Sequence, residues 1–390
     1  MQGSTADNAG TPLPAFARTG CAGVTKKKPG QDRTLGAIAR AALTGAMSAA
    51  IALAAFTTVI AAASGDARAQ PVAEFYKGKQ VSVLVGSGAG GGFDAYARLV
   101  SRHLGDHIPG SPSVVVLNKP GAGSLTMVNG LVNAGPFDGA TIGAPQSSAA
   151  VEELLHIGSK GGSAAKFKAT ALHWLGSATQ DVFILFSWHA SKIQSLDDLK
   201  RTEMLLGSSG PNTDGSLISN ALNRILGTKI KLISGYQTSG AEMLAMERGE
   251  LDGNAMAYAS VATMRPDWIA DGTIKVLAQM GMEPQPGLDA PFVLDLVKNP
   301  DDRAVLELIF AKYQMGRPLF VPPGTPADRV AALRTAFDRT MADPKLLADA
   351  DKMHLEVRAV SGKDVQAMVE RLYKTPPALA QRARDALGTE

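Results

Sequence analysis

The chain of 390 residues contains a single cysteine, Cys21, and few aromatic residues, which make up 5% of the sequence. Because Cys21 lies in the N-terminal leader, the rest of the chain can form no disulfide, no thiol nucleophile and no cysteine-ligated zinc site. An excess of one charge is also lacking, since 39 Lys and Arg residues stand against 36 Asp and Glu residues. After residue 65, no uncharged apolar run is long enough to span a bilayer.

The one long uncharged apolar run, residues 41–65, follows a basic region at residues 26–40. Ala67 and Ala69 form a small-x-small pattern just beyond it, so we expect cleavage after Ala69 and a mature chain that begins at Gln70. The run is also long enough to serve as an uncleaved membrane anchor. The Ala-Arg-Ala pattern and the abrupt change to the composition of a soluble protein favour cleavage and export to the periplasm.

Removing residues 1–69 changes the sign of the net charge. This leader carries seven Lys or Arg and three Asp or Glu, which leaves 32 basic and 33 acidic residues and a net charge of −1. The basic character of the whole chain is therefore mainly a property of the leader and gives no support to nucleic-acid binding. The remaining length favours two packed lobes over a single core.

The most informative segment of the mature chain is residues 81–94, where a short β-branched run ends in five glycines within seven residues. The residues that follow, up to position 104, have the apolar spacing of an amphipathic helix. A strand, a glycine-rich loop and a helix N-terminus together form an anion site. Backbone N–H groups point outward there, and no Cβ atom keeps the ligand away.

Strand and helix patterns alternate from residue 80 to residue 144, with strands expected at 81–85, 113–117 and 140–144 and helices at 95–104 and 125–132. Such alternation predicts a parallel sheet covered by helices, with the ligand beyond the carboxyl ends of the strands. A second glycine-rich loop, residues 118–124, follows the second strand. We expect both loops to converge on one crevice, with Gly91 and Gly121 in backbone conformations that a side chain resists.

A second βαβ unit is expected further along the chain. Ser195 and Ser239 each precede an acidic residue three positions later, which predicts a capping box and a helix start at each serine. A third polar loop, residues 207–215, leads into a helix expected at 217–226. Thr325 before Pro326 predicts another helix start, and we expect helices over the rest of the chain.

Short motifs recur in a defined order along the mature chain. They are Phe75-Tyr76-Lys77-Gly78-Lys79, Gly90-Gly91-Gly92-Phe93-Asp94, Asn118-Lys119-Pro120-Gly121-Ala122-Gly123, Asp138-Gly139, Ser239-Gly240-Ala241, Gly249-Glu250-Leu251-Asp252 and Pro323-Gly324-Thr325-Pro326. With these motifs the chain resembles the Bug family, the TctC-like substrate-binding receptors of tripartite tricarboxylate transporters. The resemblance covers nearly the whole mature chain.

The resemblance implies an α/β, two-lobed periplasmic-binding-protein fold of the type II kind, and we expect a mostly parallel sheet flanked by helices in each lobe. We expect the leader at residues 1–69, the first lobe at 70–185 with a C-terminal return at 317–390, and the second lobe at 186–316. The implied function is a non-catalytic receptor that captures a small organic acid and delivers it to membrane subunits of the TctA and TctB type. We expect this receptor to be a monomer.

The chain departs from the family pattern in each of the two glycine-rich loops. The family usually has Pro-Phe where this chain has Gly86-Ser87, and many members have glycine where this chain has Ser124. The first difference removes an aromatic wall beside the pocket. Both differences indicate a divergent branch of the family and leave the identity of the acid open.

In the family, two loops of the first lobe hold a ligand carboxylate through backbone amides and ordered water, and the second lobe closes over the rest. The candidate ligand-binding residues here are Ser87, Gly88, Gly91, Gly92, Phe93, Asp94, Asn118, Gly121, Ala122, Gly123, Ser147, Ser208, Gly210, Thr213 and Tyr236. Asp94 either touches a ligand amine or hydroxyl or complements the helix dipole. Tyr236 is either a ligand wall or a packing residue.

A Rossmann-like nucleotide-binding enzyme is the alternative, because Gly86, Gly88 and Gly91 also match the dinucleotide fingerprint. That fold needs an acidic residue at the end of the second strand, where this chain has Asn118. No Lys-Ser/Thr pair follows the glycines, which excludes a P-loop, and no serine lies in a Gly-x-Ser-x-Gly elbow. His103 and His107 have the spacing of a metal pair, but we expect a solvated helix end, no metal and no cofactor.

N-terminal sequencing of the protein recovered from the periplasm should begin at Gln70, because the Ala-Arg-Ala pattern directs cleavage after Ala69. Ala69→Leu should leave the leader attached, since signal peptidase requires a small residue there. Ala63→Leu, within the apolar run, is the matched control and should be processed normally. Recovery of the wild-type protein in the membrane fraction with its leader intact would contradict the prediction.

Overall fold

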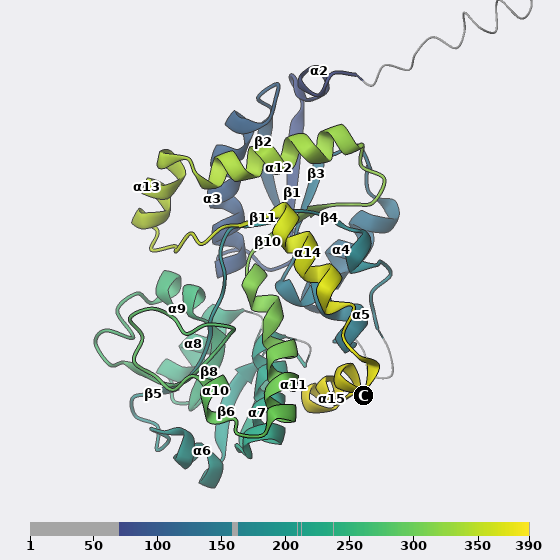
Figure 1. Cartoon of the computed structure of the whole chain (residues 1–390). Coiled ribbons are helices and arrows are strands. Elements are labelled where there is room, and N and C mark those ends of the chain that lie inside the picture. The colour runs from purple at the N-terminus through teal and green to yellow at the C-terminus, as the bar shows by residue number, and fades with distance from the viewer. Residues whose placement is uncertain (1–69, 158–162, 209, 212, 237, 390) are drawn as a thin grey trace, which may run out of the picture. The chain divides into compact units, whose positions relative to one another are not determined.

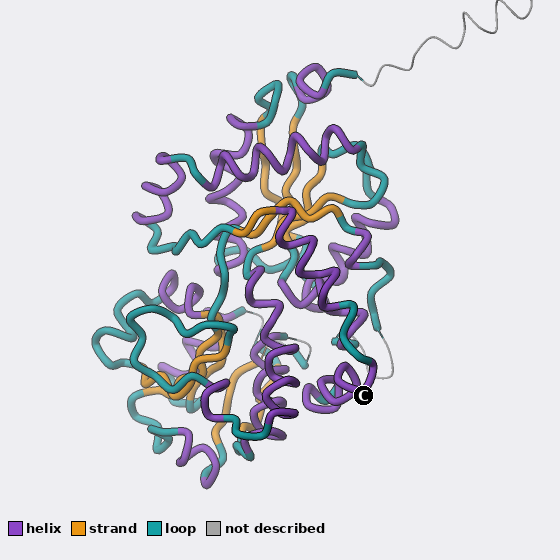
Figure 2. The backbone as a smooth tube through the Cα atoms, viewed as in Figure 1, coloured by secondary structure: helices purple, strands orange, loops and turns teal. Residues whose placement is uncertain are grey.

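The computed structural model describes residues 70–389 apart from residues 158–162, 209, 212 and 237. The predicted leader and its cleavage site therefore lie outside the described residues. From Gln70 onward the chain forms one compact unit, in which the strands fall into two sheets (Figure 2).

The first sheet has the strand order β11-β4-β10-β3-β1-β2. Its strands are β1 (Gln80–Val85), β2 (Ser113–Asn118), β3 (Thr141–Ala144), β4 (His173–Ser177), β10 (Pro318–Val321) and β11 (Val360–Ser361). β1 runs parallel to both of its neighbours, in the register that pairs Val85 with Asn118 and with Ala144. The carboxyl ends of β1, β2 and β3 therefore lie together, and both predicted glycine loops begin there.

The second sheet has the strand order β7-β6-β8-β5-β9. Its strands are β5 (Phe183–Trp188), β6 (Met204–Ser208), β7 (Ile230–Ser234), β8 (Gly253–Ala257) and β9 (Ile274–Met280). β6 runs parallel to β7 and β8, whereas β5 runs antiparallel to β8 and β9. β5 spans residue 185, where the first lobe is expected to end, and belongs entirely to the second sheet.

The prediction of a two-lobed α/β fold is confirmed, but both sheets are mixed rather than mostly parallel. β10 runs antiparallel to β3 and β4 in the first sheet, as β5 does to its neighbours in the second. A helical crossover makes successive strands of one sheet parallel, but β4 leads directly into β5 of the other sheet with no helix between them. Hydrophobic patterning reports a strand and not its direction, which is why the prediction fails at these strands.

Helices cover the sheets (Figure 1). The α-helices are α2 (Val72–Tyr76), α3 (Gly92–His107), α4 (Leu125–Ala134), α5 (Glu152–Leu155), α6 (Leu196–Arg201), α7 (Asp214–Leu226), α8 (Ser239–Glu247), α9 (Tyr258–Met264), α10 (Val293–Leu296), α11 (Pro300–Phe310), α12 (Ala327–Met341), α13 (Pro344–Lys352), α14 (Gly362–Leu372) and α15 (Pro377–Leu387). Short 3-10 turns are η1 (Ala122–Ser124), η2 (Ser147–Val151), η3 (Ala169–Ala171) and η4 (Ala311–Met315). None of the helices among the described residues combines the length and apolar character that a bilayer span needs.

The first sheet is buried on both faces. Val81, Val83 and Val85 of β1 are fully buried, and they alternate with more exposed residues along the strand. These valines belong to a cluster that also includes apolar side chains of α3 and α12. On the other face, α4 and α14 pack around Phe320 of β10. The period-two pattern of β1 thus places its valines against α3, the helix that follows the first glycine loop.

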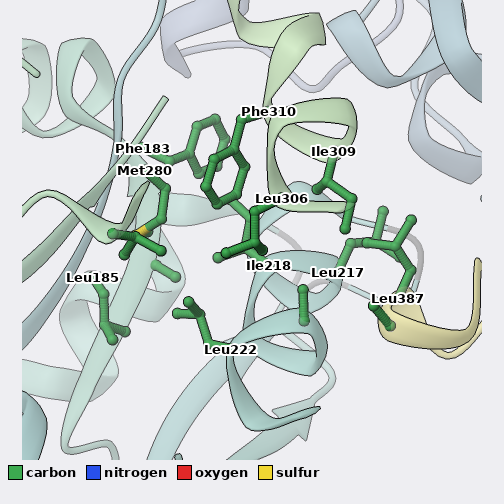
Figure 3. Close-up of a cluster of buried hydrophobic side chains, with 14 of the residues drawn as sticks. Phe183, Leu185, Leu217, Ile218, Leu222, Met280, Leu306, Ile309, Phe310 and Leu387 are labelled. Carbon is green, nitrogen blue, oxygen red and sulfur yellow. The ribbon is translucent and has the colours of Figure 1, made fainter. Parts of the chain in front are cut away.

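The second sheet is also buried on both faces, and the side chains of β5 alternate between two clusters. Phe183 and Leu185 pack against α7 and α11, as Figure 3 shows for Phe183 beside Phe310. Ile184 and Phe186 belong to the opposite cluster, which includes residues of α8 and α9. A strand with two buried faces is apolar throughout, which explains the uninterrupted apolar run in this segment.

The predicted helix starts are present, but two of the predicted caps are wrong. Ser195 caps α6 as predicted, and its Oγ accepts the N–H of Asp198 at 3.1 Å. α8 is capped by Thr238 rather than Ser239, because the Thr238 Oγ1 accepts the N–H of Ala241 at 3.2 Å. The Thr325 hydroxyl donates to the Pro322 carbonyl at 2.8 Å and therefore does not cap α12.

Gly176 of β4 is expected to tolerate no side chain. It has φ +150°, and a Cβ atom there would lie 2.0 Å from Cε1 of the buried Phe337 ring of α12. Gly176→Ala should therefore lower the free energy of unfolding by about 1–3 kcal/mol, measured by urea denaturation. In the matched control Gly130→Ala of α4, the new Cβ meets nothing within 4 Å. This control should stabilise the protein by about 0.4–1 kcal/mol, and equal stability of the two variants would contradict the packing of α12 on β4.

Candidate functional site

A cavity of about 490 Å³ lies at the carboxyl ends of β1 and β2, within the size range of small-molecule sites. One wall is made by the first glycine loop (residues 86–91), the first turn of α3 and residues 120–123 of the second glycine loop. The facing wall comes from the ends of β6 and β8 and the first turns of α7, α8 and α9. Both predicted loops thus converge on one site.

The cavity brings together predicted residues from both walls. Those that line it are Ser87, Gly88, Gly91, Gly92, Phe93, Gly121, Ala122, Gly123 and Thr213. The other predicted residues, which do not line the cavity, are Asp94, Asn118, Ser147, Ser208, Gly210 and Tyr236. Most of this second set supports the loops from behind, as the contacts described below indicate.

Two long helices begin at the cavity without a side-chain cap. α3 begins at Gly92 after Gly91, and α7 begins at Asp214 after Thr213. N–H groups in the first turn of a helix have no intrahelical acceptor, and the helix dipole concentrates partial positive charge there. None of the described lining residues is Lys, Arg or His. Among the described lining residues, the groups that can donate to an anion on the α3 side of the cavity are therefore backbone N–H groups and uncharged side chains such as the Ser87 hydroxyl.

The two loop glycines singled out from the sequence differ in conformation. The prediction that a side chain strains the backbone is wrong for Gly91, which has φ −90° and ψ 172°. A Cβ atom at Gly91 would meet nothing within 4 Å. The prediction is confirmed for Gly121, which has φ +140° and would place a Cβ atom 2.6 Å from the Thr126 Oγ1. A side chain at Gly91 would therefore extend into open space beside the cavity.

The two glycine loops are joined by a hydrogen-bonded network centred on Asp94, which is 3% exposed. One carboxylate oxygen accepts the Gly90 N–H and the Arg98 Nε–H, each at 2.9 Å. The other oxygen accepts from the Asn118 Nδ2 at 2.9 Å, and the same nitrogen donates to the Ser87 carbonyl at 3.0 Å. Asp94 and Asn118 therefore hold the first loop in place instead of lining the cavity, and Arg98 forms an ion pair with Asp94 within α3.

A second brace links the loops through Ser124, which is fully buried. Its Oγ donates to the Gly86 carbonyl at 3.0 Å and accepts the Gln146 N–H at 3.0 Å. Ser124 has φ +79°, a conformation that favours glycine. A Cβ atom at Gly86 would lie 2.3 Å from the Ser124 Oγ. The two departures from the family pattern thus depend on one another, because Ser124 fills the space that a larger residue 86 would occupy.

The remaining predicted residues have packing and bracing contacts. The Ser208 hydroxyl donates to the Gly210 carbonyl at 2.8 Å, and the Thr213 hydroxyl donates to the same carbonyl at 3.1 Å. Ser147 is buried at the start of η2. Tyr236 packs against the cluster that includes Met243 and Met246 of α8. Of the two roles open for Tyr236, the structure places it in packing rather than on the cavity wall.

Two buried ion pairs lie behind the cavity, and sequence patterns gave no sign of them. Lys312 of η4 pairs with Asp214 in the first turn of α7, and Arg317 pairs with Asp181. The Arg317 guanidinium also lies under the Phe93 ring, with its Cζ 4.1 Å from the ring centroid. The segment that returns from the second sheet to the first therefore holds both Asp214 and Phe93 in position.

The two histidines of α3 take part in a helix–helix contact. His103 contacts Asp349 at 3.2 Å, and His107 contacts Asp343 at 2.9 Å. Both aspartates belong to α13 or its N-cap, so these pairs join α3 to α13 at the end of α3 opposite the cavity. The described residues contain no group of His, Cys, Asp or Glu side chains arranged to hold a metal ion. The expectation of a solvated helix end is wrong for His103, which is 9% exposed.

Sequence comparison places the site in a known family. The family model of the tripartite tricarboxylate transporter family receptor matches residues 97–382, which is most of the chain. Curated protein sequences give no match.

Solved structures share the fold at low sequence identity. The periplasmic binding protein BugD has 19% identity and a TM-score of 0.64, and the match covers 81% of this chain and 99% of BugD. Rpa4515 from R. palustris, solved with adipate, has 19% identity and a TM-score of 0.62 over 80% of this chain and 97% of its own. MatC from Rhodopseudomonas palustris, solved with malate, has 17% identity and a TM-score of 0.60 over 79% of this chain and 99% of its own.

The Asp94 network predicts a stability that depends on pH. Burial alone would raise the pKa of Asp94, but hydrogen bonds from Arg98, Gly90 and Asn118 outweigh burial and lower the pKa below its ordinary value of 3.8. Because the pKa is lower in the folded state, the ionised carboxylate stabilises the fold above the unfolded pKa. This contribution is lost as the pH falls through the folded pKa.

Asp94→Asn should therefore lower the free energy of unfolding by about 1–3 kcal/mol at neutral pH, because Gly90 and Arg98 lose a charged acceptor. Urea denaturation should show the difference from wild type shrinking as the pH falls below the ordinary carboxyl pKa of 3.8. Asp106→Asn, at an exposed position of the same helix, is the control and should change stability by less than about 0.5 kcal/mol. A loss that is the same at neutral and acidic pH would argue against the network.

Proposed function

The chain belongs to the tripartite tricarboxylate transporter receptor family, and from this premise we propose that it captures a small organic carboxylate in the periplasm for delivery to a membrane transporter. The observation that carries the proposal is the uncapped N-terminus of α3, which lines the cavity beside the second glycine loop. The two similar structures that hold adipate and malate support a carboxylate as the ligand.

The carboxylate binds, in this proposal, to backbone N–H groups of Gly91 and Gly92 and of the second glycine loop, directly or through ordered water. Helix N-termini attract anions because their first N–H groups have no acceptor and the helix dipole adds partial positive charge. Asp94, Asn118 and Ser124 act on the ligand only through the loops that they hold. Such a site needs no basic side chain, which agrees with the composition of the described lining.

The ligand is enclosed by closure of two lobes, one built on each sheet, which we assign to residues 70–182 with 317–390 and to residues 183–316 because β5 belongs to the second sheet. The cavity is lined by loops that follow strands of the first sheet and by strands and helix starts of the second, so a ligand that touches both walls would favour a closed state. The segments between β4 and β5 and between η4 and β10 connect the two sheets and are the hinge candidates.

The expected partners follow from the family. We propose that the mature protein begins at Gln70, acts as a monomer, and presents its ligand to membrane subunits of the TctA and TctB type without a catalytic step. The alternative of a nucleotide-binding enzyme receives no support from the site. Asn118 stands where the ribose-binding acid is required, and its amide already donates to Asp94 and to the Ser87 carbonyl.

Gly91→Val should abolish binding without unfolding the protein. A Cβ atom at residue 91 meets no protein atom within 4 Å, and Gly91 lines the cavity, so the added side chain should occupy space that the carboxylate needs. Isothermal titration calorimetry with succinate, glutarate, γ-aminobutyrate and δ-aminovalerate identifies the tightest probe for the wild-type protein. The variant should bind this probe at least roughly a hundredfold more weakly, a loss of about 2.8 kcal/mol.

His107→Ala is the matched control, because it changes the opposite end of the same helix and breaks only the contact with Asp343. It should bind the probe within about a factor of two of the wild-type protein. Circular dichroism should show Gly91→Val folded. Normal binding by this folded variant would place the carboxylate elsewhere.

A further inference from the structure

The wall that the second sheet contributes to the cavity carries acidic side chains. Asp214 in the first turn of α7 and Glu242 in the first turn of α8 both line the cavity. The other described polar side chains of the lining are hydroxyls and amides, and none of the described lining residues is basic. A ligand whose carboxylate lies at α3 therefore extends toward hydrogen-bond acceptors that carry negative charge.

Glu242 is held in a fixed position in this wall. It is 7% exposed, and its Oε2 accepts a hydrogen bond from the Asn254 Nδ2 at 2.9 Å. Asn254 is held in turn by the Ala255 N–H, which donates to its Oδ1 at 2.7 Å. Gly207 leaves room for the side chain, because a Cβ atom there would lie 2.9 Å from the Glu242 Cγ. The carboxylate of Glu242 is thus held in one position in the wall and is not a mobile surface group.

Asp214 lies in the same wall, but an ion pair offsets its charge. Its side chain is 5% exposed, and its Oδ1 pairs with the buried Lys312. Its Oδ2 is buried and has no hydrogen-bond donor among the described residues. Because this oxygen has almost no accessible surface and Lys312 offsets the charge of Asp214, a ligand meets the charge of Glu242 in this wall rather than that of Asp214.

We propose that the ligand is zwitterionic, with a carboxylate at the α3 side of the cavity and an ammonium group that faces Glu242. An ammonium group has three N–H donors and a positive charge, which match the acceptors of this wall. A dicarboxylate of the same length would place its second carboxylate against Glu242, and like charges brought together in an interface are unfavourable. The inference rests on the proposed carboxylate site and names the amino acids, rather than dicarboxylic acids, as the substrate class.

Matched pairs of probes test the inference. Malonate and β-alanine, succinate and γ-aminobutyrate, and glutarate and δ-aminovalerate differ within each pair only in the replacement of one carboxylate by an ammonium-bearing carbon. Isothermal titration calorimetry at neutral pH should show the amino acid of the best-fitting pair binding at least about tenfold more tightly than its dicarboxylate. This comparison uses the wild-type protein and needs no variant to fold.

Glu242→Gln removes the charge but keeps an oxygen that can accept the Asn254 hydrogen bond. It should reduce the preference for the amino acid by about tenfold, by weakening its binding and strengthening that of the dicarboxylate. Glu247→Gln is the matched control, because it makes the same change at an exposed position of α8 and affects only the pair with Arg265. The control should leave the preference within about a factor of two of the wild-type value.

The outcomes separate this inference from the proposed function. A dicarboxylate that binds more tightly than its amino acid, and that Gly91→Val still excludes, overturns the zwitterionic ligand and leaves the carboxylate receptor standing. An unchanged preference in Glu242→Gln also overturns it. Amino acid binding that Gly91→Val does not weaken contradicts the proposed carboxylate site, and binding of neither member of any pair contradicts both proposals.

Discussion

The hydrogen bonds that Asp94 accepts at the start of α3 hold the cavity in shape. A site made from backbone N–H groups is only as well placed as the loops that carry those groups, and a glycine-rich loop has no side chains of its own to fix it. Asp94 and Asn118 lie behind the first loop and join it to the end of β2. Ser124 joins the second loop to Gly86 and to Gln146. The side chains of Asp94, Asn118 and Ser124 therefore position the loops, and the loop backbone faces the cavity together with Ser87 and Phe93.

The two walls of the cavity have different tasks in this account. The α3 wall offers helix and loop N–H groups, which attract any small carboxylate and so give little discrimination. The facing wall offers Glu242 and Asn254, whose charge and hydrogen-bonding pattern discriminate between the far ends of ligands. Selectivity then belongs to residues outside the glycine loops. Ser124 occupies the space that a side chain at residue 86 would need, which changes the packing of the α3 wall but leaves its N–H groups in place.

The sequence predicts the strands and loops well where burial imposes a simple period. The alternating valines of β1 and the apolar run of β5 follow from one or two buried faces.

The sequence predicts poorly the contacts that depend on the direction of side chains. Asp94 and Asn118 lie at the predicted edge, but their side chains turn behind the loop, which spacing cannot reveal. Glu242 fits a capping pattern in the sequence, yet its carboxylate bonds to Asn254 on β8, a contact between residues that no local pattern links. Strand direction is missed for a similar reason, because β4 and β5 are joined without a helix.

A crystal structure of the protein with its tightest-binding acid tests the central claim most directly. The account predicts that the ligand carboxylate lies within hydrogen-bond distance, about 2.7–3.2 Å, of N–H groups in the two glycine loops or the first turn of α3, directly or through one ordered water. It also predicts that no Lys or Arg side chain touches that carboxylate. A carboxylate seated against β8 and α8, or paired with a basic side chain, would contradict the claim that backbone N–H groups of the glycine loops form the anion site.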